Sequence, residues 1–289
     1  IVLCLVGSEM CIRDRTDRHE KELLYGPTNE EMITEIGKHY LKSYKDLPLN
    51  LYHIQSKFRD EIRPRFGVMR AREFLMKDAY SFDLTEDECH KTYINYFKMY
   101  LLIFKKLGIP IIPVRAPSGE IGGSLSHEFH MIVDSGESEI FFSGDLLKKN
   151  LFDISDSELI NIKSYTSDFE KMEVGKGKLI QKKSIELGHI FLFGQKYSKP
   201  FDLQVDSMNG KVFPYMGSYG LGVSRIPAAV IEKFNDEKGI VWPKEISPFQ
   251  LIIINLLTRD KVCCNYIDSL YENLNCLLYT SPSPRDTRR

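Results

Sequence analysis

Apolar residues recur at helical spacing in two early stretches of the chain. A helix is predicted to begin after Pro27, because Thr28 with Glu31 three residues later has the pattern of a capping box. A second capping box, Thr85 with Glu88, predicts a longer helix that should end at Gly108. The apolar positions that define the two helices are Met32, Ile33, Ile36 and Tyr40 in the first, and Phe97, Leu101 and Phe104 in the second.

Other stretches have the pattern of strands. Leu49–Phe58 and Glu73–Phe82 are predicted to pair across an Arg-, Pro- and Gly-rich loop. Further strands are predicted near Glu128–Val133, Gly188–Phe193 and Val212–Met216, before a helix from about Ser224 to Phe234. Residues 145–184 are polar and lysine-rich and predict a small insertion or mobile excursion. After a linker over Pro243–Pro248, Phe249–Leu257 is predicted to be a strand that opens a second domain. Strands with unequal loops and capped helices indicate a mixed, largely antiparallel α+β fold.

Composition narrows the class of protein. The 289 residues are 43% hydrophobic and 27% charged, which is ordinary for a globular protein, and the net charge of −1 excludes a global basic field. The apolar run Ile1–Ile12 is too short to span a bilayer, so no membrane partner is expected. Six cysteines without a C-x-x-C pair indicate reduced thiols and a cytoplasmic protein.

The loop between the first two strands concentrates positive charge. Between Lys57 and Arg72 lie six basic and two acidic residues, a local charge of +4. One guanidinium group can donate to two oxygens of a phosphate at once, so a phosphate ligand is one interpretation of this loop. A solvated basic hairpin is the alternative, and for an isolated charge run it would be the better one.

The strand after this loop favours the ligand. By the two-residue period of a strand, one face carries Phe74, Met76, Asp78 and Tyr80, and Arg70 and Arg72 continue the same parity. An aromatic ring, a thioether, a carboxylate and a phenol make a poor core face. They make a suitable floor for a ligand with a phosphate, a flat ring and an amine.

Two glycine-containing segments add to the picture. Met216–Arg225 is predicted to form a glycine-broken turn before a helix, where backbone and Arg225 could meet a polyphosphate; a structural turn is the alternative. In Gly119–His130, the residues His127, Glu128 and His130 could suggest a metal site. They lack the i, i+4 histidine pair and a third ligand, so a hydrogen-bonded His127 within a pocket is preferred, and no protein cage for a metal is predicted.

These segments together resemble a known family. Phe58–Glu61 and Met69–Phe74 are similar to motif 2 of class II aminoacyl-tRNA synthetases, and Met216–Arg225 is similar to motif 3. The run from Glu73 to Phe82 resembles bacterial prolyl-tRNA synthetases in particular, as do Gly188–Ser198 and Gly239–Pro243. The resemblance covers about Asp17 to Leu274. It implies an ATP-dependent ligase that joins L-proline to its tRNA through prolyl-adenylate, in the cytoplasm and as a homodimer, with Mg²⁺ accompanying ATP.

The resemblance also implies roles for individual residues. Arg59 would bridge the carboxylate of proline and the α-phosphate, Glu61 would orient adenine, and Phe74 would stack on it. Arg70 and Arg225 would hold the outer phosphates, and Arg59 and Arg225 would be the catalytic residues. The proline-binding set would be Thr28, Glu30, Arg59, Met76, Asp78, Tyr80, His127, Phe129 and Ser218.

The family pattern also divides the chain. Residues 16–245 would be the catalytic core, an antiparallel sheet flanked by helices, with the short 145–184 stretch in place of the editing domain of many bacterial relatives. Residues 246–276 would begin an α/β anticodon-binding domain. Segments 1–15 and 277–289 resemble translated sequencing-adapter read-through, or disordered tails, and motif 1 of the dimer interface is not found.

Two alternatives remain open. Another enzyme of the same class, most plausibly a threonyl-tRNA synthetase, would require zinc-binding Cys and His residues that the sequence does not offer. A non-catalytic tRNA-binding paralogue would be expected to lose some of Arg59, Phe74 or Arg225, yet all three are present.

Overall fold

The computed structural model describes residues 13–16, 18–59, 61–62, 64, 67–119, 121–169, 179–249 and 251–278. The chain divides into two compact units at Val241 and Trp242. The first unit holds the sheet and most of the helices. The second contains one long helix and is described separately below.

Among the described residues, eight strands of the first unit form one large sheet. Its spatial order is β3-β4-β12-β9-β6-β5-β8-β7, and every pairing is antiparallel except β5 with β8. The expected α+β fold is therefore confirmed. In chain order the strands are β3 (Leu49–Phe58), β4 (Glu73–Asp83), β5 (Ile112–Arg115), β6 (Leu125–Ile132), β7 (Ser138–Ser143), β8 (Ser164–Thr166), β9 (Leu179–Gly194) and β12 (Tyr215–Leu221).

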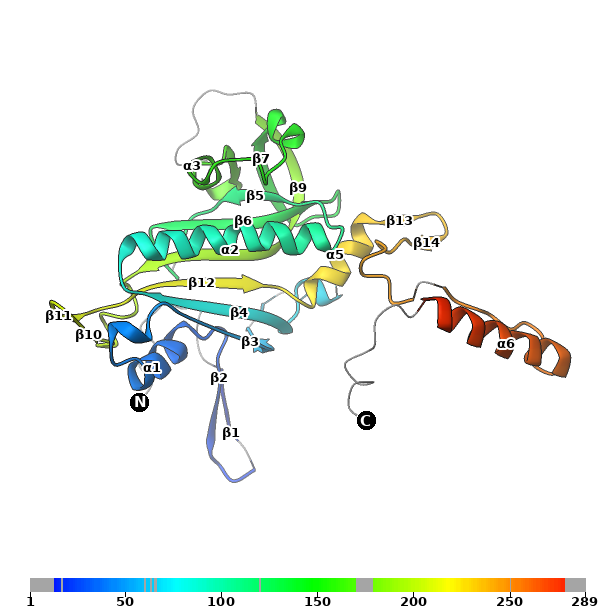
Figure 1. Cartoon of the computed structure of the whole chain (residues 1–289), viewed down its shortest axis with the longest axis horizontal. Helices are drawn as coiled ribbons and strands as arrows, with labels where there is room; N and C mark the ends of the chain where they lie inside the picture. Colours follow the sequence, from blue (N-terminus) through cyan, green and yellow to red (C-terminus); the bar gives the residue numbers. More distant parts are fainter. Residues whose placement is uncertain are drawn as a thin grey trace. The chain divides into compact units, whose positions relative to one another are not determined.

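Helices and small strand pairs complete the unit (Figure 1). The helices are α1 (Glu30–Tyr40), α2 (Glu86–Lys106), α3 (Asp156–Ile160) and α5 (Arg225–Lys233), with 3₁₀ turns η2 (Tyr44–Asp46), η3 (Gly67–Met69) and η4 (Gly144–Lys148). The strand pairs are β1 (Arg13–Thr16) with β2 (Glu22–Tyr25), β10 (Val205–Ser207) with β11 (Gly210–Val212), and β13 (Asn235–Asp236) with β14 (Gly239–Ile240).

Helix α2 covers one face of the sheet, where it packs against β4, β12 and β9 (Figure 1). It begins as predicted, with Thr85 and Glu88 bonding each other's backbone N–H groups in a capping box. Phe97, Leu101 and Phe104 are buried in the interface, and Gly108 ends the helix with a φ of +68°. On this face of the sheet, burial removes water from the amino group of Lys77 and lowers its pKa to about 8.

The opposite face of the sheet carries α1 and a second apolar cluster. Residues from β4, β9 and β12 pack there with the segment that leads to β10; the buried members include Leu41, Tyr80, Phe82, Phe191, Leu203, Val205 and Met216. Gly37 brings α1 close to this cluster, because a Cβ at that position would lie 2.9 Å from Leu203 Cδ1 and 3.2 Å from the Phe82 ring. This arrangement fixes the N-terminus of α1 over the sheet.

The far end of the sheet closes into a ring of five strands. The first half of β9 pairs with β7, while its second half pairs with β6 and β12, so the path β9-β6-β5-β8-β7 returns to β9. Ile112, Val114, Ile140 and Phe142 fill the ring. The described part of 145–184 is thus built into the fold, contrary to the expected excursion, because it supplies β8 and the beginning of β9; residues 170–178 lie outside the described residues.

Three local predictions are wrong in informative ways. Helix α1 has Asn29 rather than Thr28 at its N-cap, because the Thr28 hydroxyl bonds the Glu30 carboxylate instead of the backbone. The strand predicted over Val212–Met216 is split, since β11 ends at Val212 and β12 begins at Tyr215. Most of the predicted glycine-broken turn is strand β12 itself, and only the residues after Leu221 turn towards α5.

The second unit lacks the strand predicted over Phe249–Leu257. The described residues of that stretch have no strand assignment, and the regular element is instead helix α6 (Lys261–Leu278). Most of the segment predicted to be a terminal tail, 279–289, lies outside the described residues, as do residues 1–12; Arg13–Arg15 belong to β1. Within the described part of the chain, the helices are too short or too polar to cross a lipid bilayer.

Candidate active site

Strand register gathers the chemically active side chains on the sheet face that carries α1. One row across the sheet joins His53, Asp78, Gly220, His189 and Glu128, which are direct partners in adjacent strands. The next row on the same face includes Tyr80, Ser218 and Ser126. Because neighbouring positions alternate in direction, the row between them points towards α2. The side chains that the alternation in β4 placed on one face therefore do share one face of the sheet with their partners in the neighbouring strands.

Glu30 lies at the end of this surface where α1 begins. It is the first residue of α1, and only 3% of it is exposed. The hydroxyl of Thr28 donates to its carboxylate, and Ser218 Oγ donates to Oε1 at 3.1 Å. The structure thus brings Ser218, 188 positions away in the sequence, to the carboxylate of Glu30, which also accepts from its near neighbour Thr28.

Asp78 and Tyr80 form the floor beside Glu30. The Tyr80 hydroxyl donates to Asp78 Oδ2 at 3.1 Å, and both side chains are buried. Burial, together with the charges of Glu30 and Asp78, raises the pKa of Tyr80 far above its usual value, so the phenol stays a neutral donor. Met76 continues this face, and its Cε would lie 3.7 Å from a Cβ placed on Gly220.

The same floor contains residues that the sequence analysis did not select. Lys57 Nζ lies 2.6 Å from Asp78 Oδ2, and His53 Nε2 lies 3.1 Å from both atoms. Asn29 joins them from the N-cap of α1. Lys57 and His53 share one parity within β3, and the predicted pairing of β3 with β4 was the available signal that they face Asp78.

The basic loop approaches the surface from the other end. The Arg59 guanidinium lies 5.1 Å from the centre of the Phe74 ring, and its backbone N–H donates to Arg72 O. Arg70 Nε lies 2.9 Å from Glu61, and this hydrogen bond raises the pKa of Arg70. Asp60, Arg63 and Arg65, which contributed to the predicted charge, lie outside the described residues.

Arg225 at the N-terminus of α5 lies against this loop. Its Nε donates to Met69 O at 3.1 Å, and one terminal nitrogen donates to Glu186 O at 2.9 Å. The guanidinium is therefore fixed beside the residue that precedes Arg70. The two arginines predicted to hold phosphates come from segments 155 positions apart and are brought to one place.

Two carboxylates and a histidine meet near Arg225. The ligand atoms of Glu128, Glu186 and His189 all lie within 4.8 Å of one another. Burial opposes the charge of Glu186, but the hydrogen bond and charge of His189, with Arg225 and His130 nearby, lower its pKa. Carboxylate oxygens are the ligands that Mg²⁺ prefers, so this cluster fits a divalent cation. The sequence analysis had considered Glu128 only with its neighbours in β6. One of them, His130, does lie 2.6 Å from Glu128, but the other two members of the cluster, Glu186 and His189, are on β9.

His127 and Phe129 do not join the predicted set. Their parity in β6 places them on the face covered by α2, where both contact Phe97 and are fully buried. His127 Nδ1 lies 2.7 Å from the Tyr93 hydroxyl, and Nε2 lies 3.1 Å from Ile160 O. Burial lowers the pKa of His127 to about 3. The residue is hydrogen-bonded, as predicted, but in the core rather than in the pocket.

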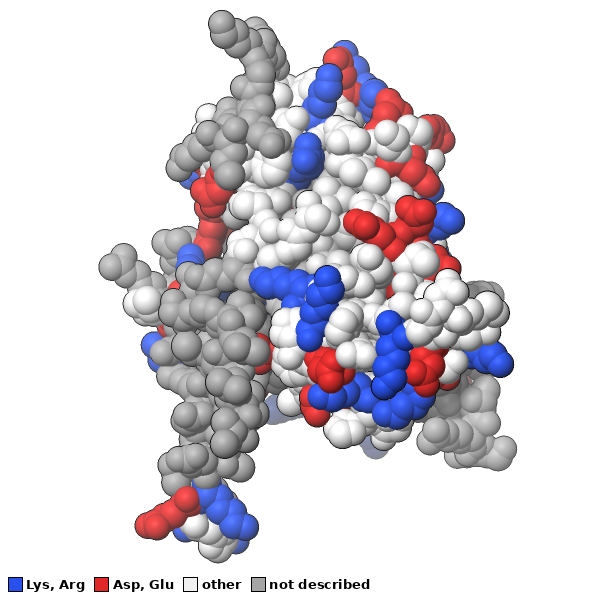
Figure 2. All heavy atoms as spheres, turned by 90° about the vertical axis from the view of Figure 1, so that its left-hand side faces the viewer, with Lys and Arg blue, Asp and Glu red and all other residues white. Residues whose placement is uncertain are grey.

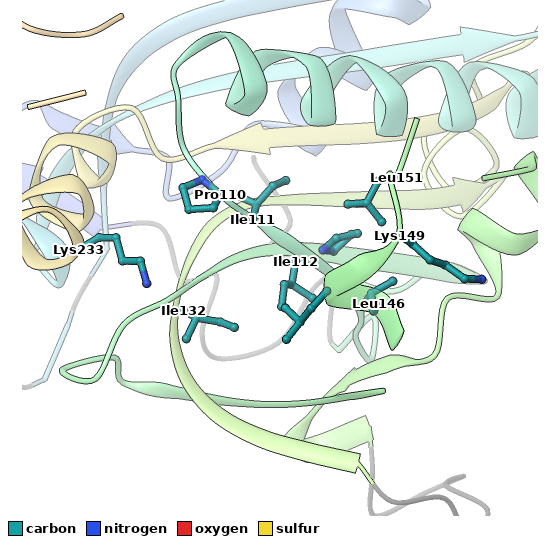
Figure 3. A pocket seen from close by; sticks show the side chains of 10 residues that line it. Pro110, Ile111, Ile112, Ile132, Leu146, Lys149, Leu151 and Lys233 are labelled. Atoms are coloured by element: carbon teal, nitrogen blue, oxygen red, sulfur yellow. The ribbon is translucent and has the colours of Figure 1, made fainter. Parts of the chain in front are cut away.

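Two hollows among the described residues of the first unit lie apart from most of these residues. A cavity of about 350 Å³ between β5, β6 and η4 has apolar walls with Lys149 and Lys233 at its edge (Figure 3). None of the predicted site residues lines it. A second hollow of about 260 Å³ is lined by Arg115 and Ser126 among others. On the face seen in Figure 2, basic and acidic side chains are interspersed, in line with the nearly neutral net charge.

Comparison with known proteins places this geometry in a family context. Residues 11–234 match the family model of the tRNA synthetase class II core domain (G, H, P, S and T). The proline--tRNA ligase of Rickettsia africae (strain ESF-5) is 52% identical over 266 residues, which are 90% of this chain and 62% of that protein. The proline--tRNA ligase of Rickettsia canadensis (strain McKiel) is 49% identical over 266 residues, 60% of its length. The chain thus spans less than two thirds of these relatives.

A solved structure has the same fold. The prolyl-tRNA synthetase from Cryptosporidium parvum, complexed with L-proline and AMP, aligns with a TM-score of 0.63 over 92% of this chain and 47% of that one. The two sequences are 18% identical, so this likeness concerns the fold.

Proposed function

Since the chain belongs to the family of class II tRNA synthetase core domains, we propose that the protein it comes from joins L-proline to its tRNA, using ATP. The relatives that support this are proline--tRNA ligases at 49–52% identity. The observation that carries the proposal is the shared sheet face, which has a buried carboxylate at one end and fixed arginines at the other. That order suits a ligand with an ammonium group at one end and a polyphosphate at the other.

We assign the roles along this face as follows. Glu30, with Thr28 and Ser218, would receive the secondary ammonium of proline, and Met76, Asp78 and Tyr80 would line the pocket. Arg59 would bridge the carboxylate of proline and the α-phosphate, while Phe74 and Glu61 would position adenine. Arg70 and Arg225 would hold the outer phosphates. His127 and Phe129 have no contact role in this proposal, because they support the pocket from the α2 side.

The chemistry requires positioning rather than a protein nucleophile. The carboxylate of the amino acid attacks the α-phosphorus of ATP and pyrophosphate leaves; a ribose hydroxyl of the tRNA then takes the aminoacyl group and AMP leaves. Guanidinium groups held in place by carbonyl oxygens, as Arg225 is, stabilise charge at phosphorus without reorganising. Mg²⁺ bound with ATP would neutralise phosphate charge, and Glu128 and Glu186 would hold it. We further propose a cytoplasmic homodimer that binds proline tRNA.

ATP–pyrophosphate exchange by the complete protein tests the proposal. Exchange should depend on proline and should be much weaker with alanine, cysteine or threonine. Arg59→Ala should lower the exchange rate by about 10² to 10³, as expected for a lost transition-state donor, while the exposed Arg259→Ala should not. Exchange driven best by threonine would overturn the choice of substrate, and an unchanged rate in Arg59→Ala would overturn the role of that residue.

A further inference from the structure

Lys57 is a fully buried lysine beside the amino-acid pocket. Its side chain is 0% exposed, although lysine is among the residues least often buried. It lies near the end of β3, in the segment whose charge suggested phosphate binding. Its ammonium group points away from the described part of the basic loop and back along the strand, towards His53 and Asp78.

The partners of the ammonium group account for its burial. Nζ lies 2.6 Å from Asp78 Oδ2 and 3.1 Å from His53 Nε2. With the Asn29 amide oriented so that its oxygen faces the cluster, that oxygen lies 2.8 Å from Nζ. These partners match the three donors of an ammonium group, and one of them carries the opposite charge. Leaving either member of such a buried pair alone is costly, so each residue requires the other.

The pair also determines how many charges the pocket offers to a ligand. Asp78 and Glu30 both act on Tyr80, so two carboxylates meet at one buried corner. The charge of Asp78 is matched by Lys57. Among the described residues, the Glu30 carboxylate is hydrogen-bonded to the hydroxyls of Thr28 and Ser218, which carry no charge. Glu30 is therefore the carboxylate left to meet a positive ligand.

A second observation concerns the other oxygen of Asp78. Oδ1 is buried and makes no hydrogen bond to any described residue, while Oδ2 is held by Lys57 and Tyr80. A carboxylate held through one oxygen is fixed in orientation, and its free oxygen remains able to accept a bond. This is the arrangement of a preorganised acceptor rather than of a simple internal ion pair.

We propose that Lys57 is a positioning residue for the amino-acid substrate. By pairing with Asp78 it holds Asp78 and Tyr80 in place and leaves Glu30 as the single counter-ion for the ammonium group of the amino acid, with Asp78 Oδ1 as a second acceptor. The inference rests on the proposed function. Lys57 acts through Asp78 and touches neither ATP nor the reacting atoms.

A double-mutant cycle in the complete protein tests this role. Lys57→Met, Asp78→Asn and the double variant are compared by ATP–pyrophosphate exchange, with the exposed Lys45→Met as a matched control. Lys57→Met should raise the KM for proline by about tenfold or more and change the KM for ATP by less than about threefold. In the Asp78→Asn background the same substitution should change the KM for proline by less than about threefold, because the two residues act as one unit.

Each outcome decides the question. Equal effects of Lys57→Met with and without Asp78 would overturn the inference, as would an unchanged KM for proline in a folded Lys57→Met. If Lys57→Met alone does not fold, Asp78→Asn and the double variant still decide. In Asp78→Asn the amide oxygen can still accept from the lysine, and the double variant leaves no unpaired charge. A further rise in the KM for proline in the double variant would overturn the inference. Absence of proline-dependent exchange in the unmodified protein would overturn the proposed function and, with it, this inference; exchange with an unchanged Lys57→Met would overturn the inference alone.

Discussion

Replacing His127 should remove a pH dependence from the stability of the first unit. Burial lowers the pKa of His127 to about 3 in the folded protein, while an unfolded histidine has a pKa of about 6.5. Below about pH 6.5 the unfolded state therefore binds a proton that the folded state does not bind. The contribution of His127 to the free energy of unfolding should be constant above about pH 6.5 and should fall by about 1.4 kcal/mol per pH unit below it, until His127 itself is protonated.

His127→Gln provides the comparison. Glutamine offers a donor for Ile160 O and an acceptor for the Tyr93 hydroxyl, but it does not titrate. At about pH 8 the variant should be less stable by about 1–3 kcal/mol, because the hydrogen bonds of the imidazole are imperfectly replaced. Between about pH 8 and about pH 5 the difference from the unmodified protein should shrink by about 2 kcal/mol, since only the histidine protein loses stability through this site.

Urea unfolding at several pH values measures both quantities. The exposed His39→Gln serves as the control and should keep the pH dependence of the unmodified protein. Equal pH slopes in the unmodified protein and in His127→Gln would refute the reasoning, since they would mean that His127 is not held neutral by burial.

Three further predictions concern packing, capping and specificity. Gly217→Ala would place a Cβ 2.4 Å from Tyr219 Oη, so the free energy of unfolding, measured by thermal unfolding, should fall by about 1–3 kcal/mol. Gly220→Ala is the control, because the nearest atom to its Cβ would be 3.6 Å away. Equal losses in the two variants would contradict the packing argument. Thr85→Ala should lower the free energy of unfolding in urea by about 1 kcal/mol, because it removes the side-chain cap of α2. Thr85→Ser keeps the hydroxyl and should lower it by less. Equal losses in the two variants would exclude the hydroxyl as the cause. Discrimination against alanine should be finite, because each methylene that alanine lacks is worth only about 1–3 kcal/mol. The complete protein should therefore form alanyl-tRNA slowly and leave its removal to a separate deacylase; hydrolysis of alanyl-tRNA by the protein itself would refute this.

Local signals in the sequence predicted the elements that build the site. The bounds of β3 and most of β4, the capping box of α2 and the parity of Phe74, Met76, Asp78 and Tyr80 depend on neighbouring residues, and the structure has them as predicted. The confirmed family accounts for the order of the segments along the chain.

Features set by distant partners could not be predicted in this way. Alternation in β6 separates His127 from Glu128, but it does not say which of them faces α2; only pairing with β9 decides that. The ring at the end of the sheet depends on the parallel pairing of β5 with β8, which leaves no local pattern. The apolar run Phe249–Leu257 has the composition of a strand, but a strand requires a partner, and no partner strand occurs in the described residues of the second unit.

The strict alternation of β4 has a consequence for how such a protein can change during evolution. Asp78 and Tyr80 lie on the face of the proposed amino-acid pocket, while Lys77 and Ala79 face α2. Insertion or deletion of one residue within the strand would exchange these faces, burying a carboxylate under the helix and placing a lysine on the face of the proposed pocket. Point substitutions can adjust the pocket one side chain at a time, but gains and losses of sequence are tolerated only in the loops. Lineages that diverge in substrate preference should therefore differ in the amino acids of this strand and agree in its length.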